Sequence, residues 1–134
     1  MSSTIFIVDD EEGIRDIFET IIKIYFRDKV KSGALVIIKA EDGSVAVNKA
    51  KGTLPDFILM DVKMPNMDGI EAFYAIKALN GDIPVKTFFI TGFASDGEIG
   101  NRMDQAIRDG ALGMLPKPIS SPDLKKLVDD HVSL

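Results

Sequence analysis

Cysteine and tryptophan are absent from the 134-residue sequence, and histidine occurs once, at His131. Without cysteine the chain can form no disulfide, use no thiolate as a nucleophile and bind no zinc through sulfur. A single histidine also excludes a metal site built from several imidazoles. The sequence shows no basic segment followed by an apolar run at its start, and no apolar stretch long enough to span a bilayer. We therefore expect a cytoplasmic protein without a membrane partner.

Positive charge is also scarce. Lys and Arg number 16 against 21 Asp and Glu, which gives a formal net charge of −5. Binding to a phosphate backbone requires clustered Lys and Arg, so we predict no nucleic-acid partner. Hydrophobic residues make up 46% and charged residues 28% of the chain, a balance typical of a globular domain. The length fits one domain, and we expect residues 1–134 to form it.

Five short apolar runs are predicted to form buried strands. They are Thr4–Val8, Leu35–Ile38, Phe57–Met60, Val85–Ile90 and Leu112–Leu115. Between and after them, apolar residues recur at the spacing of one helix face, as in the segment from Ile14 to Tyr25. Five strands alternating with five helices predict a parallel sheet covered on both faces. Ligands of such sheets bind beyond the carboxyl ends of the strands, where the strand order reverses.

Three of the predicted helices have recognisable start signals. Asp68 and Glu71 are spaced as a capping box. Ser95 and Glu98 have the same spacing at the start of the next helix. For the last helix we predict Ser121 as the N-cap, followed by proline at the first helical position.

Polar residues lie at or just after the ends of four of the predicted strands. They are Asp9 and Asp10 after the first strand, Asp61 after the third, Thr91 after the fourth and Lys117 after the fifth. In a parallel sheet these three carboxylates, one hydroxyl and one ammonium meet at one edge. Clustered carboxylates repel one another and need a cation or protons to be stable together. A hard divalent cation such as Mg²⁺ prefers oxygen ligands of this kind.

The same residues have the chemistry for phosphoryl transfer. A carboxylate can attack phosphorus and form an aspartyl phosphate. Mg²⁺, the Lys117 ammonium and the Thr91 hydroxyl would then each neutralise or fix one phosphoryl oxygen, and Gly92 would leave room for the donor. Each residue alone has a simpler interpretation: Asp9 and Asp10 as a helix start, Asp61 as a turn residue, Thr91 as a strand terminus and Lys117 as a surface lysine.

From Thr4 to Val132, nearly its whole length, the chain resembles the receiver domains of bacterial response regulators. The matching segments are Val8-Asp9-Asp10-Glu11, Pro55-Asp56-Phe57-Ile58-Leu59-Met60-Asp61, Met64-Pro65-Asn66-Met67-Asp68-Gly69, Thr91-Gly92 and Pro116-Lys117-Pro118. Each segment alone is weak evidence, but together they are highly specific. The resemblance implies an α/β, flavodoxin-like doubly wound (βα)5 domain. Its five-stranded parallel sheet has the order 2-1-3-4-5, with helices on both faces.

The resemblance also implies the role of each acidic residue. Asp61 is implied to be the phosphoacceptor of a two-component or phosphorelay signalling system. Asp9, Asp10, Asp61 and the backbone carbonyl of Lys63 are implied to hold Mg²⁺. Thr91 and Lys117 are implied to contact the phosphoryl group, and the peptide bond between Lys117 and the following proline is expected to be cis.

The implied partner is a sensor histidine kinase or a histidine phosphotransfer protein, with a downstream protein target or effector domain. The domain would be a signalling switch and not an enzyme that turns over small molecules. It would catalyse its own phosphorylation and slow dephosphorylation, as a monomer or weak dimer.

Two features depart from the family pattern. An aromatic residue commonly lies three positions before the lysine, and here that position is Met114, so a rotating aromatic switch is not implied. The segment from Thr91 to Lys117 is about four residues longer than usual, close to one helical turn. Lys63 and Phe93 are expected to crowd the water that would hydrolyse the phosphoryl group, and we therefore predict slow hydrolysis.

Three rival functions remain. Haloacid-dehalogenase-like phosphatases also form an aspartyl phosphate, but they carry a second Asp two residues after the nucleophile, where this chain has Lys63. A flavodoxin-like flavin carrier would need rings to stack on the flavin, and the chain has no Trp and two Tyr. A degenerate receiver that acts by binding alone would not need Asp61, Thr91 and Lys117 together.

Overall fold

The computed structural model describes residues 2–92 and 97–134. Its centre is a sheet of five strands: β1 (Ser3–Val8), β2 (Leu35–Ala40), β3 (Phe57–Met60), β4 (Thr87–Thr91) and β5 (Gly113–Pro116). All neighbouring strands are parallel, and their order is β2-β1-β3-β4-β5. The predicted fold class and strand order are confirmed.

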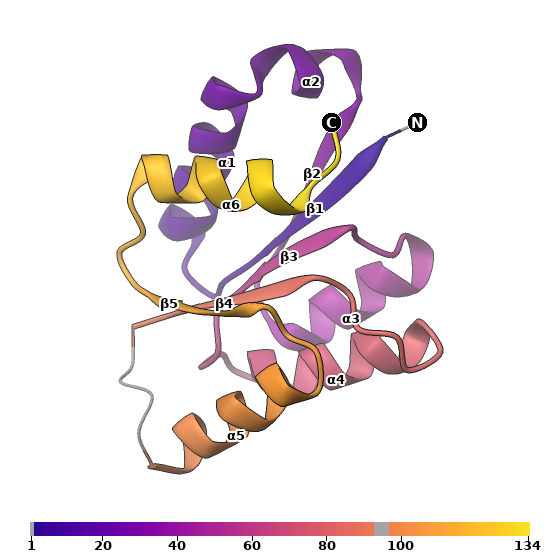
Figure 1. Ribbon diagram of the computed structural model, residues 1–134, viewed down its shortest axis with the longest axis vertical. Coiled ribbons are helices and arrows are strands. Elements are labelled where there is room, and N and C mark those ends of the chain that lie inside the picture. Colours follow the sequence, from indigo (N-terminus) through magenta and orange to yellow (C-terminus); the bar gives the residue numbers. More distant parts are fainter. Residues whose placement is uncertain (1, 93–96) are drawn as a thin grey trace.

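Six helices lie in the described residues. They are α1 (Glu12–Tyr25), α2 (Arg27–Ser32), α3 (Gly43–Gly52), α4 (Gly69–Leu79), α5 (Gly97–Arg108) and α6 (Ser121–His131). Helices α1 and α6 cover one face of the sheet, while α3, α4 and α5 cover the other (Figure 1). Among the described residues, no helix combines the length and the apolar character needed to cross a membrane.

The sheet is buried on both faces, which explains why its strands read as continuous apolar runs. In β1, Phe6 faces the cluster beneath α3, α4 and α5, whereas Ile7 faces the cluster beneath α1 and α6. Both side chains are fully buried. Because the core occupies both faces, polar chemistry is confined to the ends of the strands.

The helix starts agree with the sequence in part. The capping box of α4 is confirmed, with hydrogen bonds in both directions between Asp68 and Glu71. The N-cap predicted for α6 is wrong by one residue, because the Ser120 hydroxyl and not that of Ser121 accepts a hydrogen bond from the Asp123 amide. Ser95, predicted to cap α5, lies outside the described residues.

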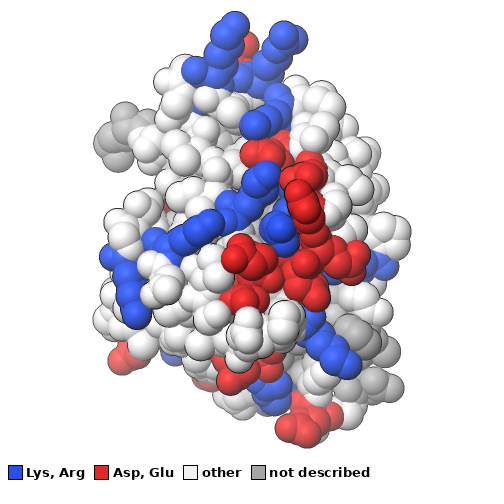
Figure 2. Space-filling model, turned by 180° about the vertical axis from the view of Figure 1, so that it is seen from behind, with Lys and Arg blue, Asp and Glu red and all other residues white. Residues whose placement is uncertain are grey.

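Helix α2 was not predicted. It is only six residues long, contains no buried residue and has one half-buried apolar residue, Val30. A helix of this kind has no apolar face, so the apolar spacing that marks the other helices is missing from its sequence. Its Lys and Arg side chains are exposed, and basic side chains gather at this end of the molecule (Figure 2).

Candidate functional site

The backbone of the sheet fixes the polar residues that follow its strands. The ladder of hydrogen bonds continues one step beyond the strands, from the Asp61 amide to the Val8 carbonyl (2.9 Å) and from the Lys117 amide to the Thr91 carbonyl (2.8 Å). These residues therefore share one edge of the sheet, next to the point between β1 and β3 where the strand order reverses. The sequence predicted this position.

Three carboxylates meet at this edge. One oxygen from each of Asp9, Asp10 and Asp61 lies within 4.8 Å of the other two. Asp9 and Asp61 are buried, with exposed fractions of 1% and 5%, whereas Asp10 is exposed. Asp9 is therefore not part of an ordinary solvated helix start, because α1 begins three residues later and the side chain points into the molecule.

Lys117 neutralises part of this negative charge. Its Nζ lies 2.7 Å from Oδ2 of Asp9 and 3.4 Å from Oδ2 of Asp61. Burial works against the charged ammonium, but the hydrogen bond to Asp9 and the charges of both carboxylates raise the pKa of Lys117. Its side chain is 17% exposed. The peptide bond between Lys117 and Pro118 is cis, as expected. Lys117 is not a free surface lysine.

The surroundings of the Asp61 carboxyl shift its pKa. Burial, and after it the negative charge of Asp9, raise this pKa to about 6, while Lys117 and the Val62 amide oppose the change. The Val62 amide donates a hydrogen bond of 2.9 Å to Oδ1 of Asp61 and so orients the carboxylate. At neutral pH the group is ionised, but its charge is less well stabilised than in water.

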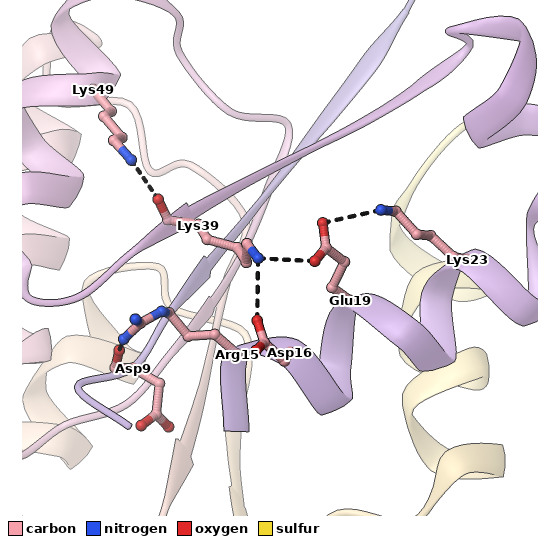
Figure 3. Close-up of polar contacts among 7 residues, drawn as sticks. All are labelled: Asp9, Arg15, Asp16, Glu19, Lys23, Lys39 and Lys49. Atoms are coloured by element: carbon pink, nitrogen blue, oxygen red, sulfur yellow. Dashed lines mark hydrogen bonds and ion pairs between the residues drawn. The ribbon is translucent and has the colours of Figure 1, made fainter. Parts of the chain in front are cut away.

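Helix α1 holds the Asp9 backbone in place. The Arg15 guanidinium donates to the Asp9 carbonyl (2.6 Å), as Figure 3 shows. On the far side of Arg15, the Lys39 ammonium of β2 pairs with Glu19 (2.9 Å) and Asp16 (3.2 Å) of α1. The first turns of α1 are thus tied to both β1 and β2, which fixes the turn that carries Asp9 and Asp10.

The loop between β3 and α4 forms one wall of the site. Gly69 starts α4 so close to Asp61 that a Cβ at Gly69 would lie 2.0 Å from the Asp61 carbonyl oxygen. The Gly69 amide donates to the Val62 carbonyl (2.7 Å). Glycine is required here because any side chain would clash with the Asp61 backbone.

These residues surround an open hollow of about 600 Å³. Its lining residues are Asp10, Glu11, Asp61, Lys63, Met64, Pro65, Gly92 and Lys117. Thr91 ends β4 at the same edge and is fully buried. The structure therefore brings together all of the predicted site residues, with the Lys63 side chain exposed at the rim. Phe93, predicted to crowd the water that would hydrolyse the phosphoryl group, lies outside the described residues.

Residues 5–129 match the family model described as the response regulator receiver domain. The chain belongs to this receiver domain family. It is 33% identical to the chemotaxis protein CheY of Bacillus subtilis over 121 residues, 90% of each chain. It is 29% identical to CheY of Halobacterium salinarum over 130 residues, 97% of each chain. The solved response regulator domain of Thermotoga maritima CheB superposes with a TM-score of 0.74 at 27% identity, covering 98% of this chain and 96% of that domain. The resemblance inferred from the sequence is confirmed, and with it a place in two-component signalling.

Two residues that support the site, Arg15 and Asp42, were not predicted from the sequence. Arg15 carries no separate signal, because an arginine within a helical segment is usually solvated. Asp42 did carry one: an Asp followed by Gly just before a helical segment is a typical N-cap. In the structure Asp42 caps α3 and also contacts the loop that follows Asp61.

Met114, at the position of the common aromatic residue, is half-buried in β5. It packs against the core cluster beneath α3, α4 and α5. This receiver domain thus has a flexible thioether where a switching ring is common, in contact with the face that α5 covers.

Proposed function

We propose that this receiver domain accepts a phosphoryl group on Asp61 from a phosphohistidine of a sensor histidine kinase or histidine phosphotransfer protein, and then changes conformation. The observation that carries the proposal is the buried Asp61 carboxylate, which lies beside Asp9 and Asp10, faces Lys117 and opens onto the hollow. On this proposal residues 1–134 act as a single receiver domain, and a downstream protein target or effector domain reads the change.

The cluster fits a hard divalent cation. Its three carboxylates supply oxygen ligands within reach of one ion, and one lysine cannot neutralise all of them. Mg²⁺ would be held by Asp9, Asp10, Asp61 and the backbone carbonyl of Lys63. When bound it supplies positive charge to the carboxylates and to the phosphoryl oxygens.

The chain's own residues perform the transfer. An oxygen of Asp61 attacks phosphorus in line, the phosphorus–nitrogen bond breaks, and the donor imidazole leaves with the bonding electrons. The Val62 amide keeps the carboxylate oriented through its bond to Oδ1. Lys117 lies next to the acceptor and can neutralise charge on the phosphoryl group. We assign the Thr91 hydroxyl, at the end of β4, to the remaining phosphoryl oxygen.

The acceptor's raised pKa suits this role. A carboxylate that burial and a neighbouring charge make less stable as an anion shares its lone pair more readily, with a proton or with an electrophilic phosphorus. The modified residue then draws the Thr91 and Lys117 side chains towards it, which favours one of two pre-existing conformations of the domain.

Intact mass spectrometry after incubation with acetyl phosphate and Mg²⁺ tests the proposal. We expect the wild type to gain the mass of one phosphoryl group, and we expect no gain for Asp61→Asn or for wild type treated with a chelator. A folded wild type that takes up no phosphoryl group would indicate a receiver that acts by binding alone. Many turnovers of an aryl phosphate ester per chain would instead indicate a phosphatase.

A further inference from the structure

Asp42 is a buried carboxylate that lies outside the acidic cluster. It precedes α3 and is 5% exposed. Its Oδ1 accepts hydrogen bonds from the Val45 amide (2.9 Å) and the Ser44 hydroxyl (2.7 Å). These two bonds are an ordinary N-cap, and they occupy one of the two carboxylate oxygens.

The second oxygen makes a long-range contact. Oδ2 of Asp42 accepts a hydrogen bond of 2.8 Å from the Asn66 side-chain amide, 24 residues further along the chain. Asn66 has a φ of 68°, the left-handed conformation that Asn adopts more readily than most residues. Bonds from Ser44, Val45 and Asn66, in that order of size, lower the pKa of Asp42, so the group is ionised at neutral pH.

Next to this bond, the start of α3 lies directly on the same loop. The Gly43 amide donates to the Met67 carbonyl (3.1 Å). A Cβ at Gly43 would lie 2.5 Å from the Met67 carbonyl oxygen and 2.9 Å from that of Asp68. Asp42 and Gly43 therefore fix the backbone of the loop at Asn66 and Met67.

This loop connects Asp61 to the start of α4. Its first residues are held by the bond from the Val62 amide to Asp61, and its end by the bond from the Gly69 amide to the Val62 carbonyl. Between them, residues 63–65 line the hollow. The hydrogen bond between Asp42 and Asn66 holds the middle part of this loop against the start of α3.

We propose that Asp42 is a positioning residue of the phosphorylation site, acting through Asn66 to hold the loop that carries the Lys63 carbonyl. The inference rests on the proposed function, in which that carbonyl is an Mg²⁺ ligand. A residue that served α3 alone could equally be Ser, because one side-chain oxygen caps a helix about as well as Asp does. The contact with Asn66 uses the second carboxylate oxygen, which the cap itself does not need.

Asp42→Ser tests this role. The serine hydroxyl can still cap α3 at the Val45 amide, but it is shorter and offers no second oxygen to accept from Asn66. We expect about 10-fold weaker Mg²⁺ binding, the size of effect seen when a group that orients metal ligands is lost. We also expect faster amide hydrogen exchange in residues 62–68. Calorimetric Mg²⁺ titration and exchange mass spectrometry measure the two effects without a phosphoryl donor.

Two further variants separate positioning from folding. Asn66→Gly removes the same contact from the other side, while glycine accepts the φ of 68°, and we expect it to weaken Mg²⁺ binding and speed loop exchange as Asp42→Ser does. Ser44→Ala removes a bond to Oδ1 but leaves the Asn66 contact, so we expect lower stability with unchanged Mg²⁺ affinity.

The outcomes are distinct. Wild-type Mg²⁺ affinity and loop exchange in a folded Asp42→Ser variant would overturn the inference and leave Asp42 as a helix cap. Wild-type values in a folded Asn66→Gly variant would also overturn it. A wild type that binds Mg²⁺ but takes up no phosphoryl group would contradict the proposed function instead, while the Mg²⁺ and exchange measurements would still decide the role of Asp42.

Discussion

At the scale of single residues, the site places charges where they weaken the folded state. Asp9 and Asp61 are buried side by side, and both face the one ammonium of Lys117. Burial and the charge of Asp9 raise the pKa of Asp61 to about 6. Functional sites commonly oppose stability in this way, because the same strain is what makes a group reactive.

We predict that Asp61→Asn stabilises the metal-free protein at pH 7.5. The raised pKa means that the ionised carboxyl is less stable in the folded than in the unfolded state. A shift of this size corresponds to about 1–3 kcal/mol of unfolding free energy. Urea unfolding of the two proteins in the presence of a chelator measures the difference.

The difference in unfolding free energy between Asp61→Asn and the wild type should depend on pH. Because the folded-state pKa of Asp61 is raised, protonation favours folding as the pH falls below about 6, and this contribution is complete near the ordinary value of 3.8. The wild type should therefore approach the stability of Asp61→Asn between pH 6 and pH 4. A difference that stays constant over this range would show that Asp61 carries no such pKa shift.

At the scale of elements, the first residue of α4 packs directly against the backbone of Asp61 at the end of β3. Gly69 leaves no room for a Cβ, because the Asp61 carbonyl would lie 2.0 Å away. Gly52, the last residue of α3, has no atom within 4 Å of the corresponding position. The two glycines thus form a matched pair, one tightly packed and one open.

We predict that Gly69→Ala lowers the unfolding free energy by about 1–3 kcal/mol, the usual cost of overpacking. It should also slow phosphoryl uptake, since the displaced backbone belongs to Asp61. Gly52→Ala should be neutral or stabilise by up to about 1 kcal/mol, because alanine is the better helix former. Equal effects of the two substitutions on stability and uptake would contradict a specific role for the Gly69 contact.

The elements also show which features the sequence could predict. The strands and the polar residues after them were predictable because a parallel sheet buried on both faces leaves continuous apolar runs that end abruptly, as at Asp9 and Asp61. Helix α2 was not, because it has no apolar face. The N-cap of α6 was placed one residue late because Ser120 and Ser121 are adjacent and chemically equal.

The sequence could not predict the contacts between loops. Asp42 was recognisable as a helix cap, but its bond to Asn66 depends on how the ends of β2 and β3 lie relative to each other. The same holds for the Arg102 guanidinium of α5, which pairs with the Asp68 carboxylate (2.9 Å) at the start of α4. Such contacts join residues that are 24 to 34 positions apart and follow no local spacing.

At the scale of the whole molecule, the site joins segments from most of the chain. Asp9 and Asp10 follow the end of β1, Asp61 follows β3 and Lys117 follows β5. The start of α3 and the side chain of Arg102 in α5 contact the loop between β3 and α4. A cation bound here would link strands that separate on unfolding. A ligand that binds only the folded state raises the unfolding free energy according to its concentration and affinity.

We therefore predict that Mg²⁺ raises the unfolding free energy of the wild type, by about 1.4 kcal/mol at ten times its dissociation constant. Thermal unfolding followed by circular dichroism, with sodium chloride at matched ionic strength as the control, measures the shift.

Asp61→Asn should start from a higher metal-free stability and gain less. Asp10→Asn should also gain less but should start near the wild type, because Asp10 is exposed and its removal relieves no buried charge. Two variants that lose the Mg²⁺ effect from different starting stabilities would locate the ion at this edge of the sheet. Full Mg²⁺ stabilisation of both variants would place the ion elsewhere on the molecule.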